Sequence, residues 1–201
     1  MSDTATVTVS NILFYDDCTS DRNADYEAIT INDFNGTPQT WSYDSVNECY
    51  NLGTGSTNSH FYGFTIKNLS NVGNCKITAK VQIGTTLNSQ IGIGLYNNSD
   101  TTVQIVSRLV KVNNTTSIIR VNPDTTIANT SQTISTNTWY TMEFENNNGT
   151  LTYNLYNSNG TLLKTLSGTT TLLSNNNTPM IYFAYERNQT ANIKEIKVES
   201  L

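Results

Sequence analysis

The stretch NTWYTMEFENNNGTLTYNLYNSNGTLLKTL, residues 137–166, alternates apolar and polar residues, breaks at Asn-Gly and then alternates again. Tyr140, Met142 and Phe144 are expected on one face of a strand, because successive side chains of a strand point to opposite faces. Residues 146–149 are Asn and Gly, which tolerate the positive φ angles of a tight turn. The stretch therefore predicts a meander of antiparallel strands with one buried face.

The same period of two recurs along the rest of the chain. We expect further strands at residues 6–15, 40–51, 61–67, 75–83, 91–97, 103–112, 117–121, 180–185 and 192–199. Turns rich in Asn, Gly and Pro separate these segments, and no amphipathic helix of about ten residues is found. Many short strands predict an all-β protein, an antiparallel β-sandwich or barrel. No linker divides the chain, so residues 1–201 are expected to form one domain.

The composition argues against nucleic acid and membrane partners. Charged residues make up 13% of the chain, the net charge is −5, and the basic residues are scattered singly. Such a surface has no positive field to attract phosphate backbones. No apolar run approaches the roughly 18 residues of a membrane helix. The N-terminus also lacks the charged and apolar regions of a secretory signal.

The three cysteines, Cys18, Cys49 and Cys75, do not have the spacing of a metal site. Two arrangements remain open: one disulfide with a leftover thiol, or three reduced and buried thiols. In a chain without a secretory signal, the second arrangement is favoured.

Six segments, taken in order, resemble a known family. They are FYDD (14–17), WSY (41–43), CKITAKVQI (75–83), IGIGLYNN (91–98), the hairpin opened by NTWYTMEF (137–144) and IYFAYERNQTANIKEIKV (181–198). Their order and spacing, from residue 12 to residue 199, resemble the concanavalin A-like lectin/glucanase (LamG-like) family of jelly rolls. The resemblance implies a jelly-roll sandwich in which the strands form the scaffold and the loops carry the chemistry.

This resemblance also implies a structural calcium between the early Asp segment and the last strand. Asp16 and Asp17 offer the hard oxygen ligands that Ca²⁺ prefers. Asn192 stands where the family has Asp, and Cys18 also departs from the family pattern. We therefore weigh a calcium site formed by Asp16, Asp17 and Asn192 against a merely solvated acidic turn.

The sequence offers little for catalysis. The glucanases of the family carry a Glu-x-Asp-x-x-Glu strand, and nothing here matches it. Glu143 and Glu145 lie on one face of one strand, and we interpret them as its solvated side rather than as a pair for glycoside hydrolysis. His60 is the only histidine, and we interpret it as structural or exposed. We expect no enzyme.

Glycan binding needs aromatic faces for sugar rings, and amides or carboxylates for hydroxyl groups. Tyr96 and Tyr185 end apolar strands just before polar loops, where a binding aromatic would lie. The predicted carbohydrate-binding residues are Trp41, Tyr62, Tyr96, Tyr185 and Arg187, with the amides of Asn97, Asn98 and Asn188 beside them in sequence.

Three functions follow from these observations. The first is a non-enzymatic virion protein, of a tail, fibre or capsid decoration, that attaches to host or cell-surface carbohydrate. It is favoured by the few charges and the Thr/Asn/Ser-rich composition, and it implies other virion proteins as partners, a homo-oligomer and a place in the virion. The alternative is a stand-alone lectin-like module, cytoplasmic or at an extracellular surface. A glycoside hydrolase is the least supported.

Overall fold

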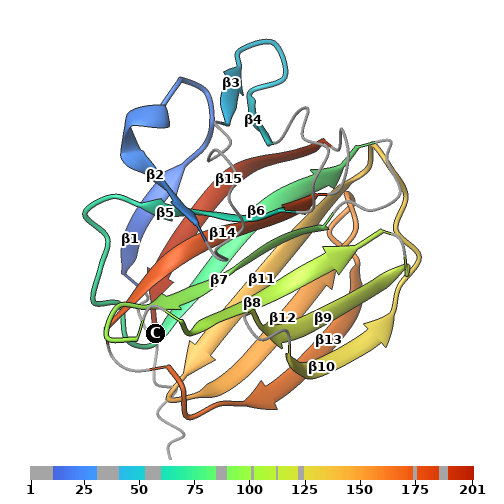
Figure 1. Cartoon of the computed structure of the whole chain (residues 1–201). Coiled ribbons are helices and arrows are strands. Elements are labelled where there is room, and N and C mark those ends of the chain that lie inside the picture. Colours follow the sequence, from blue (N-terminus) through green and yellow to red (C-terminus); the bar gives the residue numbers. More distant parts are fainter. Residues whose placement is uncertain are drawn as a thin grey trace, which may run out of the picture.

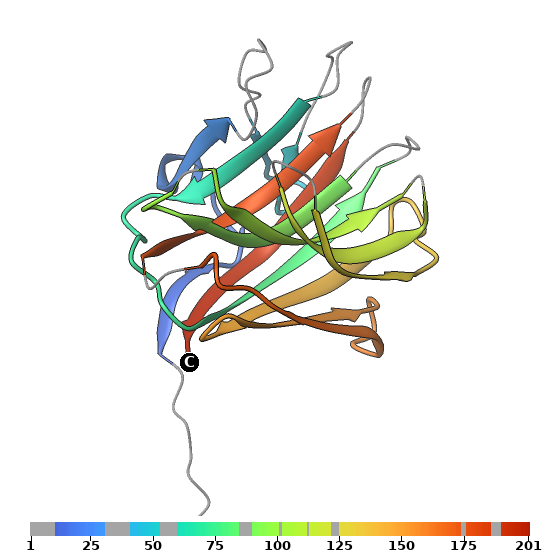
Figure 2. The same cartoon turned by 60° about the horizontal axis from the view of Figure 1, so that its bottom comes forward.

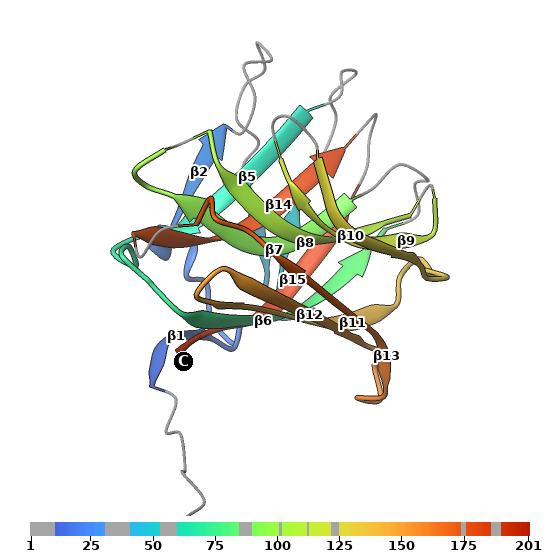
Figure 3. The same ribbon diagram turned by 90° about the horizontal axis from the view of Figure 1, so that it is seen from below.

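The computed structural model describes residues 11–30, 41–52, 60–84, 90–100, 102–111, 113–121, 125–173, 176–185 and 190–201. Their strands form two antiparallel sheets that pack face to face (Figure 1 and Figure 3). The predicted all-β sandwich is confirmed. Within these ranges the single helical element is a short 3-10 turn, η1 (Asn23–Asp25), and no helix is long and apolar enough to cross a membrane.

Sheet A has eight strands and sheet B has seven. Sheet A runs in the order β13 (Leu162–Thr169), β12 (Thr150–Tyr156), β11 (Trp139–Asn147), β6 (Cys75–Ile83), β15 (Ala191–Ser200), β4 (Cys49–Leu52) and β3 (Ser42–Asp44), and β1 (Ile12–Asp16) also pairs with β15. Sheet B runs in the order β10 (Thr125–Ser131), β9 (Thr115–Arg120), β8 (Gln104–Val110), β7 (Gln90–Asn97), β14 (Asn177–Tyr185), β5 (His60–Ile66) and β2 (Tyr26–Thr30). β1 and β15 therefore lie side by side near the C-terminus (Figure 2).

The meander predicted from residues 137–166 is present as β11, β12 and β13. Asn148 and Gly149 connect β11 to β12 with φ angles of 51° and 80°, as a two-residue hairpin turn requires. A Cβ at position 149 would lie 2.2 Å from the carbonyl oxygen of Thr170. Glycine is thus required there both by the backbone angle and by the close approach of the chain after β13.

Most predicted strands are found, with two kinds of difference. The strand predicted at 40–51 is two strands, β3 and β4, separated by a turn at residues 45–48. β2 and β10 were not predicted. β10 consists mostly of Thr, Asn and Ser at a sheet edge, so apolar alternation is absent. β2 follows directly after the short η1 turn, which ends the acidic segment.

The core between the sheets is closed at one end by aromatic rings. Trp41 stacks on Tyr50 at a centroid distance of 4.4 Å and on Phe64 at 4.7 Å, and Tyr26 meets its ring edge-on. Trp41 is 7% exposed. The prediction that Trp41 binds carbohydrate is therefore wrong, because both faces of its ring are occupied by other rings.

Asp16 joins the two sheets beneath these rings. Its carboxylate is buried, and Oδ2 accepts hydrogen bonds from the Tyr26 hydroxyl at 2.7 Å and the Tyr50 hydroxyl at 2.8 Å. Oδ1 accepts a third bond from the backbone N–H of Cys18. Tyr26 belongs to sheet B and Tyr50 to sheet A. A buried carboxylate is tolerable only with such donors, so this triad holds the sheets together at this end.

Replacing Asp16 by Asn is expected to lower the free energy of unfolding by about 2–4 kcal/mol, because hydrogen bonds to a charged acceptor are lost or weakened in a buried place. Urea denaturation measures this loss. Asp17→Asn is the matched control: Asp17 is exposed, and the hydrogen bonds that it accepts from the described residues come from Thr19, so its replacement should change stability little. Equal effects of the two substitutions would contradict this assignment.

Alkaline pH is expected to destabilise the fold. Burial, and then the hydrogen bonds to Asp16, raise the pKa of Tyr26 and Tyr50 above the ordinary 10.0, and burial raises the pKa of Cys18 and Cys75 from 9.0 to about 12. Groups with a raised folded pKa stabilise fully below their unfolded pKa and lose that contribution as pH rises above it. The unfolding free energy should therefore fall progressively above about pH 9. Urea titrations at successive pH values test this, and a flat profile to pH 11 would contradict it.

Candidate functional site

A cavity of about 320 Å³ lies on the face of sheet B that points away from sheet A. We call it the Tyr96 cavity. It is lined by Glu27 and Ile29 of β2, Thr65 and Ile66 of β5, the following turn at residues 67–70, and Tyr96, Asn98 and Thr178. Ile181 and Phe183 pack in the core between the sheets, so the alternate residues of β14 face outward. Strand alternation thus places the cavity outside the sandwich.

Strand register brings these side chains together. Tyr96 of β7 is opposite Thr178 of β14, and Glu27 of β2 is opposite Thr65 of β5. Tyr96 is half-buried and packs against a second apolar cluster that includes Met180. The ring is therefore supported by protein while part of it remains accessible, the arrangement in which an aromatic side chain can contact a sugar ring.

Hydrogen bonds fix the amide of Asn98 in the cavity. Its Oδ1 accepts from the Thr178 hydroxyl at 2.9 Å, and its Nδ2 donates to Oδ1 of Asn176 at 3.0 Å. The backbone N–H of Asn98 also donates to the carbonyl of Asn176 at 3.0 Å. An amide held at both its oxygen and its nitrogen by the segment that opens β14 loses little conformational entropy when a ligand binds, so this wall is preorganised.

The opposite wall carries the charged groups. The Lys67 ammonium donates to the carbonyl of Ala24 at 2.9 Å, and the Lys67 backbone N–H donates to the carbonyl of Asp25. Glu27 is exposed and makes no ion pair with the described residues. Its carboxylate is thus available to accept hydrogen bonds from ligand hydroxyl groups.

The structure does not gather all the predicted binding residues. Tyr96 lines the cavity. Tyr62 pairs with Phe183 near the other end of β14, and Tyr185 ends that strand, about 23 Å from Thr178 by strand rise. The side chains of Tyr62 and Tyr185, and the whole of Arg187, lie outside the described residues. Their part in binding stays a prediction.

Sequence reasoning missed the partners of Tyr96. Glu27, Thr65, Asn68 and Thr178 come from separate elements, and no motif links them. The available signal was weak: Thr65 is a polar position between the apolar residues Phe64 and Ile66 on its strand. Only the pairing of β7 with β14 and of β2 with β5 brings them together.

The predicted calcium ligands do not fit a calcium site. The Asp16 carboxylate is taken up by three protein donors, and Oδ1 of Asp17 accepts from the backbone N–H and hydroxyl of Thr19. Asn192 donates to Gln82 across β15 and β6. Asp16 pairs with Ile196, four positions and about 13 Å along β15 from Asn192. The described ranges contain no group of three His, Cys, Asp or Glu residues that could hold a metal.

The groups considered for catalysis serve the scaffold. Oε2 of Glu143 accepts from the Tyr156 hydroxyl at 2.8 Å on the outer side of sheet A. Cys18, Cys49 and Cys75 are free and buried, which confirms the predicted three thiols. Burial raises the pKa of Cys18 and Cys75 to about 12, so neither is a reactive thiolate near neutral pH. The side chain of His60 lies outside the described residues.

No protein-family model matches the sequence, and no curated protein sequence matches it. Solved structures do match. Peanut lectin with a 9mer peptide has a TM-score of 0.69 at 9% identity, covering 96% of this chain and 98% of the lectin. The CBM2 module of the evolved Dit of Lactobacillus casei BL23 phage J-1 has a TM-score of 0.68 at 14% identity, covering 94% and 95%.

The carbohydrate-binding module CBM66 from Bacillus subtilis has a TM-score of 0.63 at 14% identity, covering 86% of this chain and 95% of that module. At such identities the likeness shows the fold alone. The chain therefore has the lectin-like jelly-roll sandwich that the resemblance implied, and its function rests on its own side chains.

Proposed function

We propose that the protein is a non-catalytic carbohydrate-binding module that holds a neutral sugar in the Tyr96 cavity. The observation that carries this proposal is a half-buried aromatic ring beside a fixed amide, a hydroxyl and a free carboxylate in one cavity. The ring contacts the C–H face of a sugar, while Asn98, Thr178 and Glu27 bind its hydroxyl groups. The lectins and carbohydrate-binding modules among the similar structures support this proposal.

Binding rather than cleavage is the better account of this cavity. Glycoside hydrolysis commonly uses two carboxyl groups on either side of the bond that breaks. Of the residues that line the Tyr96 cavity, Glu27 alone has a carboxyl group. Its volume of about 320 Å³ is at the lower end of the range for small-ligand sites. A cavity of this size holds a sugar unit at the surface of the sheet.

Tyr96→Ala is expected to weaken binding to a glycan and polysaccharide array by at least ~10-fold, because a central aromatic contact is removed. Tyr15→Ala is the matched control, since Tyr15 is exposed on β1 in the other sheet. EDTA should leave binding unchanged, because Asp16, Asp17 and Asn192 do not form a calcium site. Failure of the native protein to bind any neutral sugar, or equal binding of neutral sugars by Tyr96→Ala, would overturn the proposal.

We further propose that this module belongs to a virus particle and attaches it to host or cell-surface carbohydrate. The phage Dit module of similar fold supports this finer proposal. A virion component is expected to form a homo-oligomer and to be encoded among other virion genes. Light scattering on the purified protein and inspection of the neighbouring genes test this, and a monomer encoded among unrelated genes would favour the stand-alone lectin instead.

A further inference from the structure

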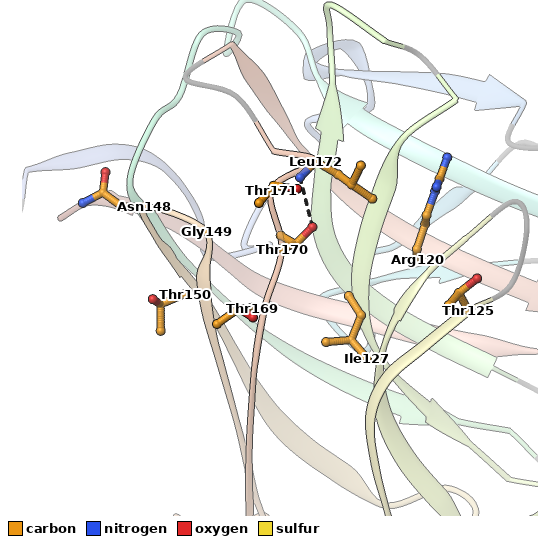
Figure 4. A pocket seen from close by; sticks show the side chains of 10 residues that line it. All are labelled: Arg120, Thr125, Ile127, Asn148, Gly149, Thr150, Thr169, Thr170, Thr171 and Leu172. Carbon is orange, nitrogen blue, oxygen red and sulfur yellow. Dashed lines mark hydrogen bonds between the residues drawn. The ribbon is translucent and has the colours of Figure 1, made fainter.

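A second cavity, of about 620 Å³, lies where the edge strands of the two sheets approach each other. β10 of sheet B contacts β13 of sheet A. Figure 4 shows Arg120, Thr125 and Ile127 on one side of the cavity, and the segment of residues 169–172 with the hairpin at 148–150 on the other. We call it the Arg120 cavity.

This cavity is separate from the Tyr96 cavity, although both adjoin the end of β7. Tyr96 and Asn98 line the first cavity. Asn97, between them, points the other way and donates from Nδ2 to the carbonyl of Leu172 at 2.8 Å, and Leu172 lines the second cavity. One short segment of chain thus supports both, with the alternation of a strand directing neighbouring residues to opposite sides.

Arg120 is the one charged residue among the residues that line this cavity. Its Nε is buried and has no hydrogen-bond partner, and the described part of the chain gives the guanidinium no ion pair. Hydrogen bonds from Thr102, and after them the charge of Arg120, lower the pKa of Asp100. Oδ1 of Asp100 already accepts from the hydroxyl and the backbone N–H of Thr102. Arg120 is half-buried, and a cation whose buried Nε–H donor is unsatisfied favours an anionic ligand.

The remaining lining is amphipathic. Leu172 is 38% exposed, and Ile127 is half-buried beside it, so the cavity offers an apolar surface to solvent. Thr169, Thr170 and Thr171 supply hydroxyl groups, and Figure 4 shows the Thr170 hydroxyl accepting from the backbone N–H of Leu172. A ligand suited to this lining combines a carboxylate, several hydroxyl groups and an apolar ring face.

We propose that the Arg120 cavity binds the carboxylate-bearing unit of an acidic saccharide, such as a uronic acid. The guanidinium of Arg120 pairs with the carboxylate, whose planar geometry it matches. Ile127 and Leu172 contact the C–H face of the ring, and the threonine hydroxyl groups bind the ring hydroxyls. This goes beyond the proposed function, because it adds a second subsite, selective for an acidic rather than a neutral sugar, on the other side of β7.

Nuclear magnetic resonance with galacturonate, glucuronate and N-acetylneuraminate tests the proposal, with galactose as the neutral probe. The chain has four arginines, and the Nε–H signal that disappears in Arg120→Gln is the signal of Arg120. Each sugar is added up to ~10 mM, which is enough to saturate a site with a dissociation constant of about 1 mM. At least one acidic sugar is expected to shift the Arg120 signal, while galactose does not. Arg120→Gln should weaken that binding at least 10-fold, Arg120→Lys less, and added salt should weaken it in the native protein.

Tyr96→Ala separates the two proposals. It should leave acidic-sugar binding at Arg120 unchanged while it removes binding of neutral glycans, so each site can fail alone. No shift of the Arg120 signal with any of the three acids would overturn the inference. Equal shifts with galactose, or undiminished binding by a folded Arg120→Gln protein, would overturn it as well.

Discussion

The buried carboxylate of Asp16 links the two sheets of the sandwich at one end. It accepts one hydrogen bond from each sheet, from the hydroxyl of Tyr26 in sheet B and from the hydroxyl of Tyr50 in sheet A. These bonds lie at the end of the sandwich where the aromatic rings stack. Burying a charge is costly, and the cost is offset only while both hydroxyls and the Cys18 N–H stay in place. The carboxylate is therefore stable only in one arrangement of its three donors, and this arrangement fixes how the two sheets meet.

β2 connects the Asp16 triad to the proposed binding site. Tyr26 turns inward to Asp16, and its neighbour Glu27 turns outward to line the Tyr96 cavity. Among the described strands, β2 is an edge strand of sheet B and pairs with β5 alone. The hydrogen bond from Tyr26 to Asp16 thus holds β2 in place in addition to its pairing with β5. The wall that carries Glu27 and Ile29 is positioned by a residue on the far side of the sheet.

The sequence predicted the scaffold better than the site. Clean alternation predicted β6 with its observed bounds, since one buried face requires such alternation. β10 was not predicted from the sequence, because an edge strand of Thr, Asn and Ser buries little apolar surface and shows no apolar alternation. Tyr96 was predicted from its place at the end of an apolar strand, but its partners come from elements joined only by strand pairing.

Asp16 and Trp41 show a second reason why the site could not be predicted from the sequence. A carboxylate in an acidic segment and a Trp beside a predicted strand are both typical of binding sites in a lectin-like protein. The tyrosines that bind Asp16 lie 10 and 34 positions along the chain, and the rings that cover Trp41 belong to different sheets. Only tertiary packing distinguishes a metal ligand from a hydrogen-bond acceptor, or a core ring from a binding surface.

The most direct test of the account is a crystal structure of the protein with a neutral glycan to which it binds. The account predicts a sugar ring against Tyr96, with its hydroxyl groups within hydrogen-bond distance of Asn98, Thr178 or Glu27. A glycan bound on another surface, with the Tyr96 cavity empty, would contradict it.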